Sequence, residues 1–428
     1  MTRSHRRLRV WAAAALVPLS LLAPAAASAS TADPSDDGLW YYTATGLEQQ
    51  HQRSTGTGIT IAVIDSAVNP NAPDLVGANV TVREPGYCAL ADGGEAPGTS
   101  TDEGARHGTQ IAALIAGTGA GINGEPGTRG VAPGADVEVY SLGTDFEDSG
   151  CAPVDVSRAF QDAVASADII NISGNYPFFE EDMLAALRAG VIVVASAGNE
   201  GRVVGFPASF NGAVTVGTLA PDLTLAQGSP LGGGVDVVAP GADIRSIAGD
   251  WQRYGRGTGS SDAAAFTSGA LALAWSLYPE ATPNQMMQSL IRNTGGTEHE
   301  PAIEDVAWGY GMVNVRQMLD SDPSAYPDVN PFLADDENAV PSMDQVRAAL
   351  GEADPDATPT PTAPAAAERD EPVAAADEPT DVSSALPIAL GAAALVVLAG
   401  AVTAVVLVRR RGRRRQPDPT TNAGGHDG

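Results

Sequence analysis

A Gly/Ser loop runs directly into an apolar, small-residue segment in Gly257-Thr-Gly-Ser-Ser-Asp-Ala-Ala-Ala-Phe-Thr-Ser-Gly-Ala-Leu-Ala-Leu-Ala-Trp-Ser-Leu-Tyr-Pro279. This pattern predicts a helix over residues 261–278, with Ser261 in its first turn. At that place the Ser261 hydroxyl and backbone N–H would lie at the positive end of the helix dipole, where an oxyanion is stabilised. Ser261 is therefore a candidate nucleophile, although serine is also an ordinary helix-capping residue. Its partners elsewhere in the chain decide between the two interpretations.

Upstream of this helix, from Gly58 on, short β-branched runs alternate with helical stretches. Nearly continuous apolar strands are typical of a parallel sheet that is covered on both faces. The predicted strands cover residues 59–64, 137–140, 169–172, 191–194, 214–216 and 235–238. The predicted helices cover residues 107–117, 155–166, 179–189, 261–278 and 283–293. The alternation predicts an α/β sandwich with a mainly parallel sheet and a ligand site beyond the carboxyl ends of its strands.

Three further residues have settings that suit acyl-transfer chemistry. Asp65 ends the first predicted strand, and His107 opens a small-residue helix. An Asp that fixes the tautomer, a His that takes the proton and a Ser that attacks form a hydrolytic triad. Asn199 follows a predicted strand in Ala-Gly-Asn-Glu-Gly, where its amide could donate to an oxyanion beside the Ser261 N–H. Taken singly, Asp65 and Asn199 are equally typical of ordinary turns.

The order of these motifs, together with Val238-Ala-Pro-Gly241, resembles that of the subtilisin-like serine proteases from about Gly58 to Leu319. The resemblance implies a three-layer α/β sandwich. It also implies that Asp65 orients His107 and that His107 is the general base and then the general acid. By the same resemblance Ser261 is the nucleophile, and Asn199 is an oxyanion donor.

Two further stretches resemble the family's substrate-binding walls. Ile170-Asn-Ile-Ser-Gly-Asn175 is similar to the strand and loop that pair with the substrate backbone, which makes Ser173 and Gly174 substrate-binding candidates. Phe206-Pro-Ala208 resembles another wall of the specificity pocket.

The nucleophile motif departs from the family pattern of Gly-Thr-Ser, a bulky residue and Ala-Ala-Pro. This chain has Gly259-Ser-Ser-Asp-Ala-Ala-Ala265, and gap-free counting to the flanking motifs assigns Ser261 rather than Ser260 as the nucleophile. Asp262 takes the place of the bulky residue. A carboxylate is favourable at a helix start, yet it would oppose an oxyanion one residue away and would raise the pKa of His107.

Both ends of the chain carry targeting patterns. Residues 1–29 have the basic start, apolar run and small-residue cleavage site of a signal peptide. Ala385 to Val408 is a run of 24 residues without a charge, long enough for a transmembrane helix, and an arginine-rich stretch follows it. The positive-inside tendency assigns the tail 409–428 to the cytoplasm and residues 30–384 to the outside. We therefore expect a single-pass protein of the cell membrane.

The segments between these ends differ in composition. Residues 30–56 are polar apart from a few aromatic side chains and are expected to form an N-terminal arm lying across the next domain. Residues 57–320 form the predicted peptidase domain. Residues 321–384 are rich in Pro, Ala and acidic side chains, which predicts a disordered, extended linker. One short helix, from Ser342 to Gly351, is expected to interrupt it.

Charge and cysteine content limit the partners and cofactors. The chain has a formal net charge of −28, and between Ser30 and Pro387 only 14 arginines face 50 acidic residues, which argues against nucleic acid as a partner. Cys88 and Cys151 are the only cysteines, and export favours one disulfide between them over two free thiols. We expect no required cofactor and assign no metal ligands. Many subtilases bind Ca²⁺, so a structural Ca²⁺ stays open, but no acidic loop here matches a calcium-ligand pattern.

The layout of signal, short arm, linker and membrane helix resembles the mycosins, membrane-anchored subtilases associated with actinobacterial type VII secretion systems. The hypothesis is therefore a serine endopeptidase outside the cytoplasmic membrane that cuts secreted or secretion-associated proteins and contacts secretion-system membrane proteins. A second hypothesis is a weakly active or inactive structural component of a secretion complex, which Asp262 favours. A third, an adhesin on a stalk, has only the acidic linker to support it.

Overall fold

The structure is a computed structural model that describes residues 37–90, 93–143, 151–153, 156–202, 204–303 and 305–351. These residues belong to one compact unit. The predicted signal peptide, the linker beyond residue 351, the predicted membrane segment and the tail lie outside the described residues. Within the described ranges, no helix is both long and apolar enough to cross a membrane.

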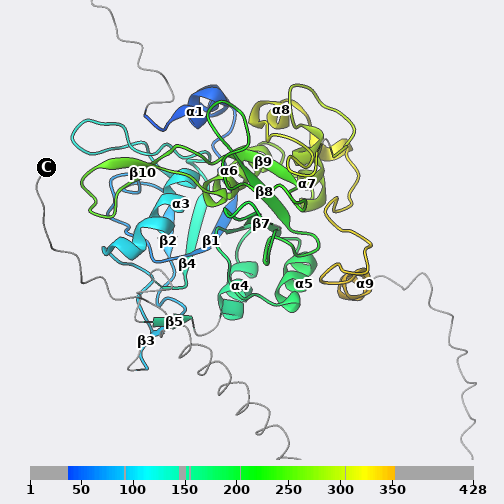
Figure 1. Ribbon diagram of the computed structural model, residues 1–428, viewed down its shortest axis with the longest axis horizontal. Coiled ribbons are helices and arrows are strands. Elements are labelled where there is room, and N and C mark those ends of the chain that lie inside the picture. Colours follow the sequence, from blue (N-terminus) through cyan, green and yellow to red (C-terminus); the bar gives the residue numbers. More distant parts are fainter. Residues whose placement is uncertain are drawn as a thin grey trace, which may run out of the picture. The chain divides into compact units, whose positions relative to one another are not determined.

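A seven-stranded parallel sheet forms the centre of the described domain (Figure 1). The strand order is β2-β4-β1-β6-β7-β8-β9. The strands are β1 (Thr60–Asp65), β2 (Val80–Val82), β4 (Asp136–Ser141), β6 (Ile169–Ile172), β7 (Ile192–Ser196), β8 (Val214–Leu219) and β9 (Val237–Pro240). From β1 the chain forms β2 and then β4 on one side, and it crosses to β6 on the other side of β1. The carboxyl end of β1 is therefore a topological switch point, where α/β proteins bind their ligands.

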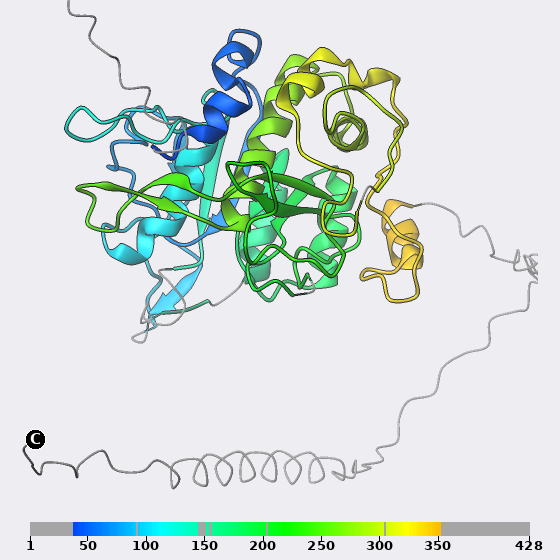
Figure 2. The ribbon, with the colours of Figure 1, turned by 45° about the horizontal axis from the view of Figure 1, so that its top comes forward.

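Helices cover both faces of the sheet and complete the three predicted layers (Figures 1 and 2). One face carries α3 (Arg106–Ala116) and α6 (Ser260–Leu277), and the other carries α4 (Val156–Val164) and α5 (Glu180–Ala189). Because both faces are covered, β6 to β9 are buried along their whole length, which explains their unbroken apolar runs. The predicted α/β class and mainly parallel sheet are confirmed.

Small side chains allow α6 to run through the middle of one apolar layer. Nearly all of its residues from Ala263 to Trp275 are buried. A Cβ atom added to Gly269 would lie 2.7 Å from the Val131 Cβ, so only glycine permits this close approach. The helix therefore holds its first turn, with Ser261, in a fixed place over the sheet.

The N-terminal arm forms two short helices, α1 (Trp40–Ala44) and α2 (Leu47–Gln50), which the sequence did not predict. Its aromatic residues enter the domain. Trp40 Nε1 donates to the Ala242 carbonyl at 2.8 Å, and the Tyr41 hydroxyl donates to the Arg129 carbonyl at 2.5 Å. The Tyr41 ring also meets the Phe266 ring edge to face. The arm is thus part of the apolar core rather than a covering on its surface.

Shorter elements complete the described domain. The helices α7 (Pro283–Arg292) and α8 (Val315–Asp320) follow α6. Two antiparallel pairs lie outside the main sheet: β10 (Ile244–Ile247) with β11 (Tyr254–Gly257), and β3 (Cys88–Leu90) with β5 (Cys151–Pro153). Cys88 is disulfide-bonded, and the chain has one other cysteine, Cys151, which lies in the strand paired with that of Cys88.

The structure corrects the predicted start of the linker at residue 321. Tyr326 and Phe332 are buried, and helix α9 (Met343–Leu350) buries Val346 completely. The loop residue Asn211 holds this segment, because its backbone N–H donates to the Val340 carbonyl at 2.7 Å. A few widely spaced apolar residues are enough to hold a segment that packs against a folded domain. The average composition of the segment, which is rich in Pro and acidic residues, does not reveal them.

Helix α9 itself begins and ends as its sequence indicates. The Ser342 hydroxyl accepts from the Gln345 N–H, and the Gln345 side chain accepts from the Ser342 N–H, which together form a capping box. Gly351 ends the helix in the left-handed conformation. The short helix expected from Ser342 to Gly351 is therefore present, but in a packed segment.

Candidate active site

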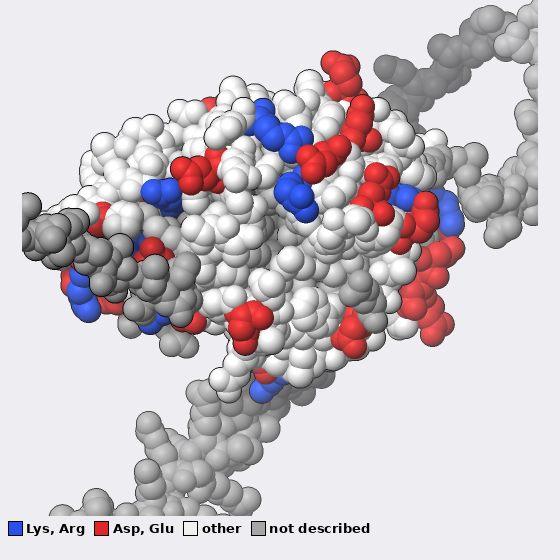
Figure 3. Space-filling view, turned by 90° about the horizontal axis from the view of Figure 1, so that it is seen from above, with Lys and Arg blue, Asp and Glu red and all other residues white. Residues whose placement is uncertain are grey.

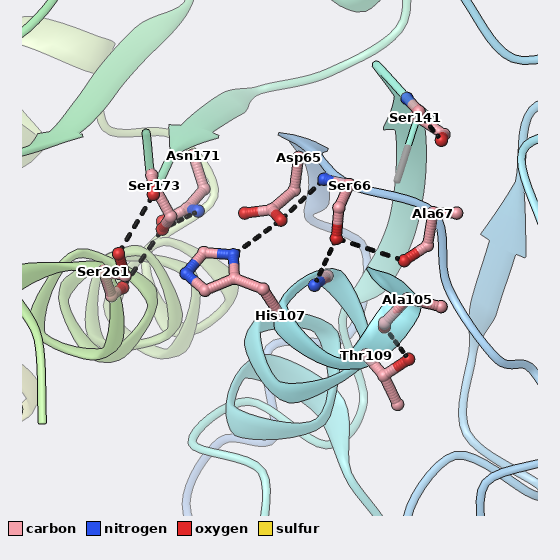
Figure 4. Close-up of polar contacts among 12 residues, drawn as sticks. Asp65, Ser66, Ala67, Ala105, His107, Thr109, Ser141, Asn171, Ser173 and Ser261 are labelled. Atoms are coloured by element: carbon pink, nitrogen blue, oxygen red, sulfur yellow. Dashed lines mark hydrogen bonds and ion pairs between the residues drawn. The ribbon is translucent and has the colours of Figure 1, made fainter. Parts of the chain in front are cut away.

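Four elements bring the predicted site residues to the carboxyl edge of the sheet. Asp65 is the last residue of β1, and Asn199 follows the end of β7. His107 and Ser261 lie in the first turns of α3 and α6. In Figure 4 the His107 imidazole lies between the Asp65 carboxylate and Ser261. The structure thus assembles residues that are far apart in the sequence.

Asp65 and His107 form a buried acid–imidazole pair. The Asp65 side chain is fully buried, and its Oδ1 lies 2.7 Å from His107 Nδ1. The Ser66 N–H donates to the same oxygen at 2.6 Å. An imidazole that donates its Nδ1 proton to a carboxylate keeps Nε2 as the basic nitrogen. This arrangement leaves the basic nitrogen on the ring side that faces Ser261 in Figure 4.

Ser66, which the sequence analysis did not single out, fixes the start of α3 against the end of β1. Its Oγ accepts from the Gly108 N–H at 2.9 Å. A Cβ atom on Gly108 would lie only 2.5 Å from the Ser66 carbonyl oxygen, so the helix can approach this closely only with glycine there. The contact sets the position of His107 relative to Asp65.

The two adjacent serines at the start of α6 have different surroundings. Ser260 is almost fully buried, and its Oγ accepts from the Gly198 N–H at 3.0 Å. Ser261 is partly exposed, and its Oγ donates to the Ser173 carbonyl at 3.0 Å. Ser261 is thus the accessible hydroxyl beside the imidazole, in agreement with the spacing of the motif.

Asn199 has an amide whose orientation is set by the start of α6. Its Oδ1 accepts from the Ser260 N–H at 2.8 Å, which leaves Nδ2 as the donor end. The Asn199 side chain is exposed. The Ser261 N–H belongs to the first turn of α6, where N–H groups have no intrahelical acceptor. The start of α6 therefore presents two hydrogen-bond donors of the kind that stabilise an oxyanion.

Ser173 and Gly174 lie directly after β6, and Ser173 contacts α6. The Ser173 hydroxyl donates to the Ser261 carbonyl at 3.1 Å and accepts from Asn171 Nδ2 at 3.0 Å. A side chain on Gly174 would collide with the Tyr176 ring at 2.8 Å. Both substrate-binding candidates therefore lie beside the nucleophile, while the Ser173 hydroxyl is engaged within the protein. Their contact with substrate stays a prediction.

Asn171 is a buried member of the site that the sequence analysis missed. Besides its bond to Ser173, Asn171 accepts a hydrogen bond through Oδ1 from the Ser268 hydroxyl at 3.1 Å. This bond joins β6 to the middle of α6. A signal was present in the sequence, because Asn171 is the one polar residue in the strand Ile169-Ile-Asn-Ile172. A buried polar side chain in a central strand has to be hydrogen-bonded.

Asp262, the residue that departs from the family motif, is turned against α3. It is 5% exposed, and its Oδ1 accepts from Gln110 Nε2 at 3.2 Å. Burial raises the pKa of Asp262 to about 6, although the Gln110 hydrogen bond and the nearby charge of His107 act in the opposite direction. Gln110 was also missed, and its signal was a polar residue within the apolar part of α3.

Charge is unevenly distributed over the described surface. Figure 3 shows a largely uncharged face with acidic side chains gathered toward one side.

Among the residues that the structure describes, no group of three or more His, Cys, Asp or Glu side chains could hold a metal ion. The expectation that no cofactor is required stays a prediction.

Comparison with known proteins shows which family the chain resembles. The profile of the subtilase family matches residues 56–311. The chain is 32% identical over 259 residues to the major intracellular serine protease of Bacillus subtilis (strain 168), covering 56% of this chain and 76% of that protein. It is 30% identical over 279 residues to subtilisin NAT of Bacillus subtilis subsp. natto, covering 62% of this chain and 66% of that protein, which is just under two thirds.

Solved structures have the same fold. Fervidolysin from Fervidobacterium pennivorans, a keratinolytic enzyme related to subtilisin, aligns with a TM-score of 0.55 at 26% identity, over 68% of this chain and 48% of its own. The prenylagaramide maturation protease PagA aligns with a TM-score of 0.52 at 24% identity, over 64% of this chain and 98% of its own. The family profile covers more than half of the chain. The chain therefore belongs to the subtilase family of serine endopeptidases.

Proposed function

We propose that this chain cleaves proteins or peptides as a membrane-anchored extracytoplasmic serine endopeptidase, through Asp65, His107 and Ser261. The observation that carries the proposal is the His107 imidazole, bonded to Asp65 through Nδ1 and lying beside the accessible Ser261 hydroxyl. Family membership supports the same reaction class.

In the acylation step, Ser261 Oγ attacks the scissile carbonyl while its proton passes to His107 Nε2. Asp65 stabilises the imidazolium that forms. Asn199 Nδ2 and the Ser261 N–H donate to the resulting oxyanion. The C–N bond then breaks, and the imidazolium gives its proton to the leaving amine, which yields the acyl-enzyme.

In the deacylation step, a water molecule takes the place of the amine. Its proton passes to His107, its oxygen attacks the ester carbonyl, and the same oxyanion donors act again. The C–O bond to Ser261 breaks as the proton returns to Oγ. In both steps His107 is the group of the chain that accepts a proton and then gives it up.

Labelling of the purified ectodomain with a fluorophosphonate tests this proposal. The reagent reacts with an activated serine, so the wild-type protein is expected to be labelled, whereas Ser261→Ala and His107→Ala are not. Ser260→Ala is the matched control, because the Ser260 hydroxyl is buried on the Gly198 N–H. Absence of labelling in a wild-type protein with intact tertiary structure would refute the proposal.

The cellular setting is proposed from the sequence layout. A signal over residues 1–29, a membrane helix over Ala385 to Val408 and an arginine-rich tail support an anchored protein whose catalytic domain is extracytoplasmic. The same layout supports a mycosin-like role in type VII secretion, with secretion-system membrane proteins as partners. Export also supports a disulfide between Cys88 and Cys151.

Two measurements test the setting. Deletion of residues 385–428 is expected to release the protein from the membrane fraction into the medium, and retention of the shortened protein would contradict the anchor. Mild detergent extraction is expected to recover other membrane proteins with the full chain. Recovery of the chain always by itself would contradict the secretion-complex role.

One observation favours a second function, a structural component with little proteolysis. Asp262 puts a carboxylate next to the nucleophile, where it opposes an oxyanion. The labelling experiment separates the two functions, because a folded but unlabelled ectodomain is the result that the structural role requires.

A further inference from the structure

Asp262 and Gln110 join the two helices that carry the reacting side chains. Asp262 follows Ser261 directly on α6, and Gln110 lies one turn after His107 on α3. Gln110 Nε2 donates to Asp262 Oδ1 at 3.2 Å and to the Arg245 carbonyl at 3.0 Å. Both residues are about 5% exposed, so water does not replace these bonds. The amide is therefore a buried connection between the nucleophile's helix and the base's helix.

Titratable and charged groups from several elements face Asp262, among them the Tyr41 hydroxyl of the N-terminal arm. From α3 it faces the charges of His107 and Arg106, and from β1 it faces Asp65. The hairpin of β10 and β11 brings the Arg245 carbonyl to Gln110, with Arg256 opposite Arg245 in the register.

The Arg245 guanidinium is directed elsewhere. It pairs with Glu125 at 3.0 Å and stacks over the Tyr254 ring. Gly257 lines the remaining side, and a Cβ atom there would lie 3.6 Å from Asp262 Oδ2. The Gln110 amide, the charges of His107 and Arg106 and the N-terminal dipole of α6 all favour an ionised Asp262.

We propose that Asp262 is a positioning residue of this active site, which ties α6 to α3 through Gln110 and whose buried charge stabilises the protonated form of His107. The inference rests on the proposed catalytic roles of Ser261 and His107. It assigns a function to the residue that most separates this chain from the family motif.

The electrostatic part follows from reciprocity. The charge of His107 lowers the pKa of Asp262, so an ionised Asp262 raises the pKa of His107 by the same interaction. His107 becomes an imidazolium in each acyl-transfer step, and Asp262 favours that state. The same negative charge disfavours the oxyanion. Asp262 therefore stabilises the positive charge that develops on His107 and opposes the negative charge that develops on the oxyanion.

The variants Asp262→Asn and Asp262→Ala separate charge from connection. Both remove the negative charge, but only Asn keeps an acceptor for Gln110 Nε2. We expect both to lower the pKa of His107, because each removes a nearby negative charge. We expect kcat to change by less than about threefold in Asp262→Asn and to fall about tenfold or more in Asp262→Ala, because small misplacements of reacting groups slow the chemical step strongly.

NMR titration of the His107 ring gives the pKa without any need for activity. The mature ectodomain has three histidines, His51, His107 and His299, and His107→Ala assigns the signal. Asp222→Asn is the control, since Asp222 lies on an exposed turn bonded to Thr224; it should leave the His107 pKa unchanged. An unchanged His107 pKa in Asp262→Asn would overturn the role of the charge.

A double-mutant cycle on kcat tests the connection. Gln110→Met keeps the side-chain volume and removes the donor, so it should lower kcat as Asp262→Ala does, and the combined variant should lose no more than either alone. Additive losses, or equal kcat in Asp262→Asn and Asp262→Ala, would overturn the connection. Failure of fluorophosphonate labelling in the wild-type protein would refute the proposed function, whereas the titration result would still stand.

Discussion

The side-chain amide of Asn199 cannot exchange the positions of Oδ1 and Nδ2 without losing a hydrogen bond. Its Oδ1 is held by the Ser260 N–H, so Nδ2 is committed to donation. The donor is therefore in place before any substrate arrives. Pre-oriented donors stabilise an oxyanion without reorganisation during the reaction, and this makes them effective.

We expect Asn199→Ala to lower kcat by about 10² to 10³-fold with little change in KM, because the lost hydrogen bond is made mainly in the transition state. Steady-state hydrolysis of a peptide substrate measures this. Asn338→Ala serves as the control, because Asn338 bonds only within its own exposed turn at Asp336. An equal rise in KM with unchanged kcat would contradict an oxyanion role.

The raised pKa of Asp262 predicts a pH-dependent stability. Its pKa is about 6 in the folded protein against an ordinary value near 3.8. The folded state therefore favours the protonated carboxyl, and this contribution to stability is complete below pH 3.8 and is lost as the pH rises through 6. We expect Asp262→Asn to raise the free energy of unfolding by about 1–3 kcal/mol at pH 8 and by little at pH 4.

Thermal unfolding at the two pH values measures this difference. Asp222→Asn is again the matched substitution, because the exposed Asp222 carboxylate has a lowered pKa through its bonds to Thr224. It should not raise the melting temperature at pH 8. If Asp262→Asn raised the melting temperature equally at both pH values, the result would contradict a raised pKa of Asp262 in the folded protein.

The main site residues could be predicted because their motifs occur together in the order of the subtilisin-like proteases, although each motif taken singly is a weak signal. Asp65 ends an apolar strand, and His107 and Ser261 begin apolar helices. Gln110 and Asn171 could not be assigned a partner from sequence, since their hydrogen bonds reach Asp262 and Ser268 across layers of the fold. Local patterns indicate where a polar side chain lies, but only the packing of helices on the sheet shows what it contacts.

At the scale of elements, long apolar runs predicted the central strands and the covering helices within a few residues. The missed elements are short or carry polar residues. The edge strand β2 has three residues, and β10 includes Arg245, whose guanidinium is bonded on all sides by loops. Edge strands and hairpins owe their structure to partners that come from distant parts of the chain, and a local pattern does not contain this information.

Helix α1 is an element whose stability comes from tertiary contacts, because five residues are too few for an isolated helix. Tyr41 supplies two of these contacts: its hydroxyl donates to the Arg129 carbonyl at 2.5 Å and accepts from the Arg129 N–H at 3.2 Å. The ring is completely buried. The arm is thus held by bonds to main-chain groups as well as by apolar contact.

We expect Tyr41→Phe to lower the free energy of unfolding by about 1–2 kcal/mol, because both main-chain partners lose their hydrogen bond inside the protein. Tyr42→Phe is the matched control, since the Tyr42 hydroxyl makes one longer contact of 3.3 Å with His51 on a partly exposed side chain. Urea unfolding of the two variants measures the difference. Equal losses of unfolding free energy in the two variants would contradict the conclusion that the buried Tyr41 hydroxyl stabilises the fold more than the Tyr42 hydroxyl does.

At the scale of the molecule, the domain ends later than its composition indicates. The Asn211 side chain holds residues 330–341, with Nδ2 donating to the Ala334 and Pro341 carbonyls at 3.1 and 3.0 Å. The Gly212 N–H donates to the Phe332 carbonyl at 3.1 Å. These bonds connect the segment after α8 to the loop between β7 and β8.

A shortened chain that ends at residue 351 should melt at the same temperature as one that ends at residue 384. A chain that ends at residue 320 should melt at least about 4 °C lower, because it removes the partners of the Asn211 side chain in residues 330–341 and uncovers apolar surface. Differential scanning calorimetry compares the three lengths. A chain ending at 320 with the full melting temperature would contradict the domain boundary given by the packing.

The arm also determines the order in which the chain completes its fold. Trp40 bonds to Ala242 across 202 residues of sequence, and the Asp37 carbonyl accepts from the Arg245 guanidinium across 208. The first described part of the chain therefore cannot dock fully until the region of β10, with Ala242 and Arg245, has been made. Contacts of such long range form late and slow the folding of a domain. During that interval the aromatic arm of a newly made chain is undocked, and a chaperone or another protein that binds apolar segments can reach it.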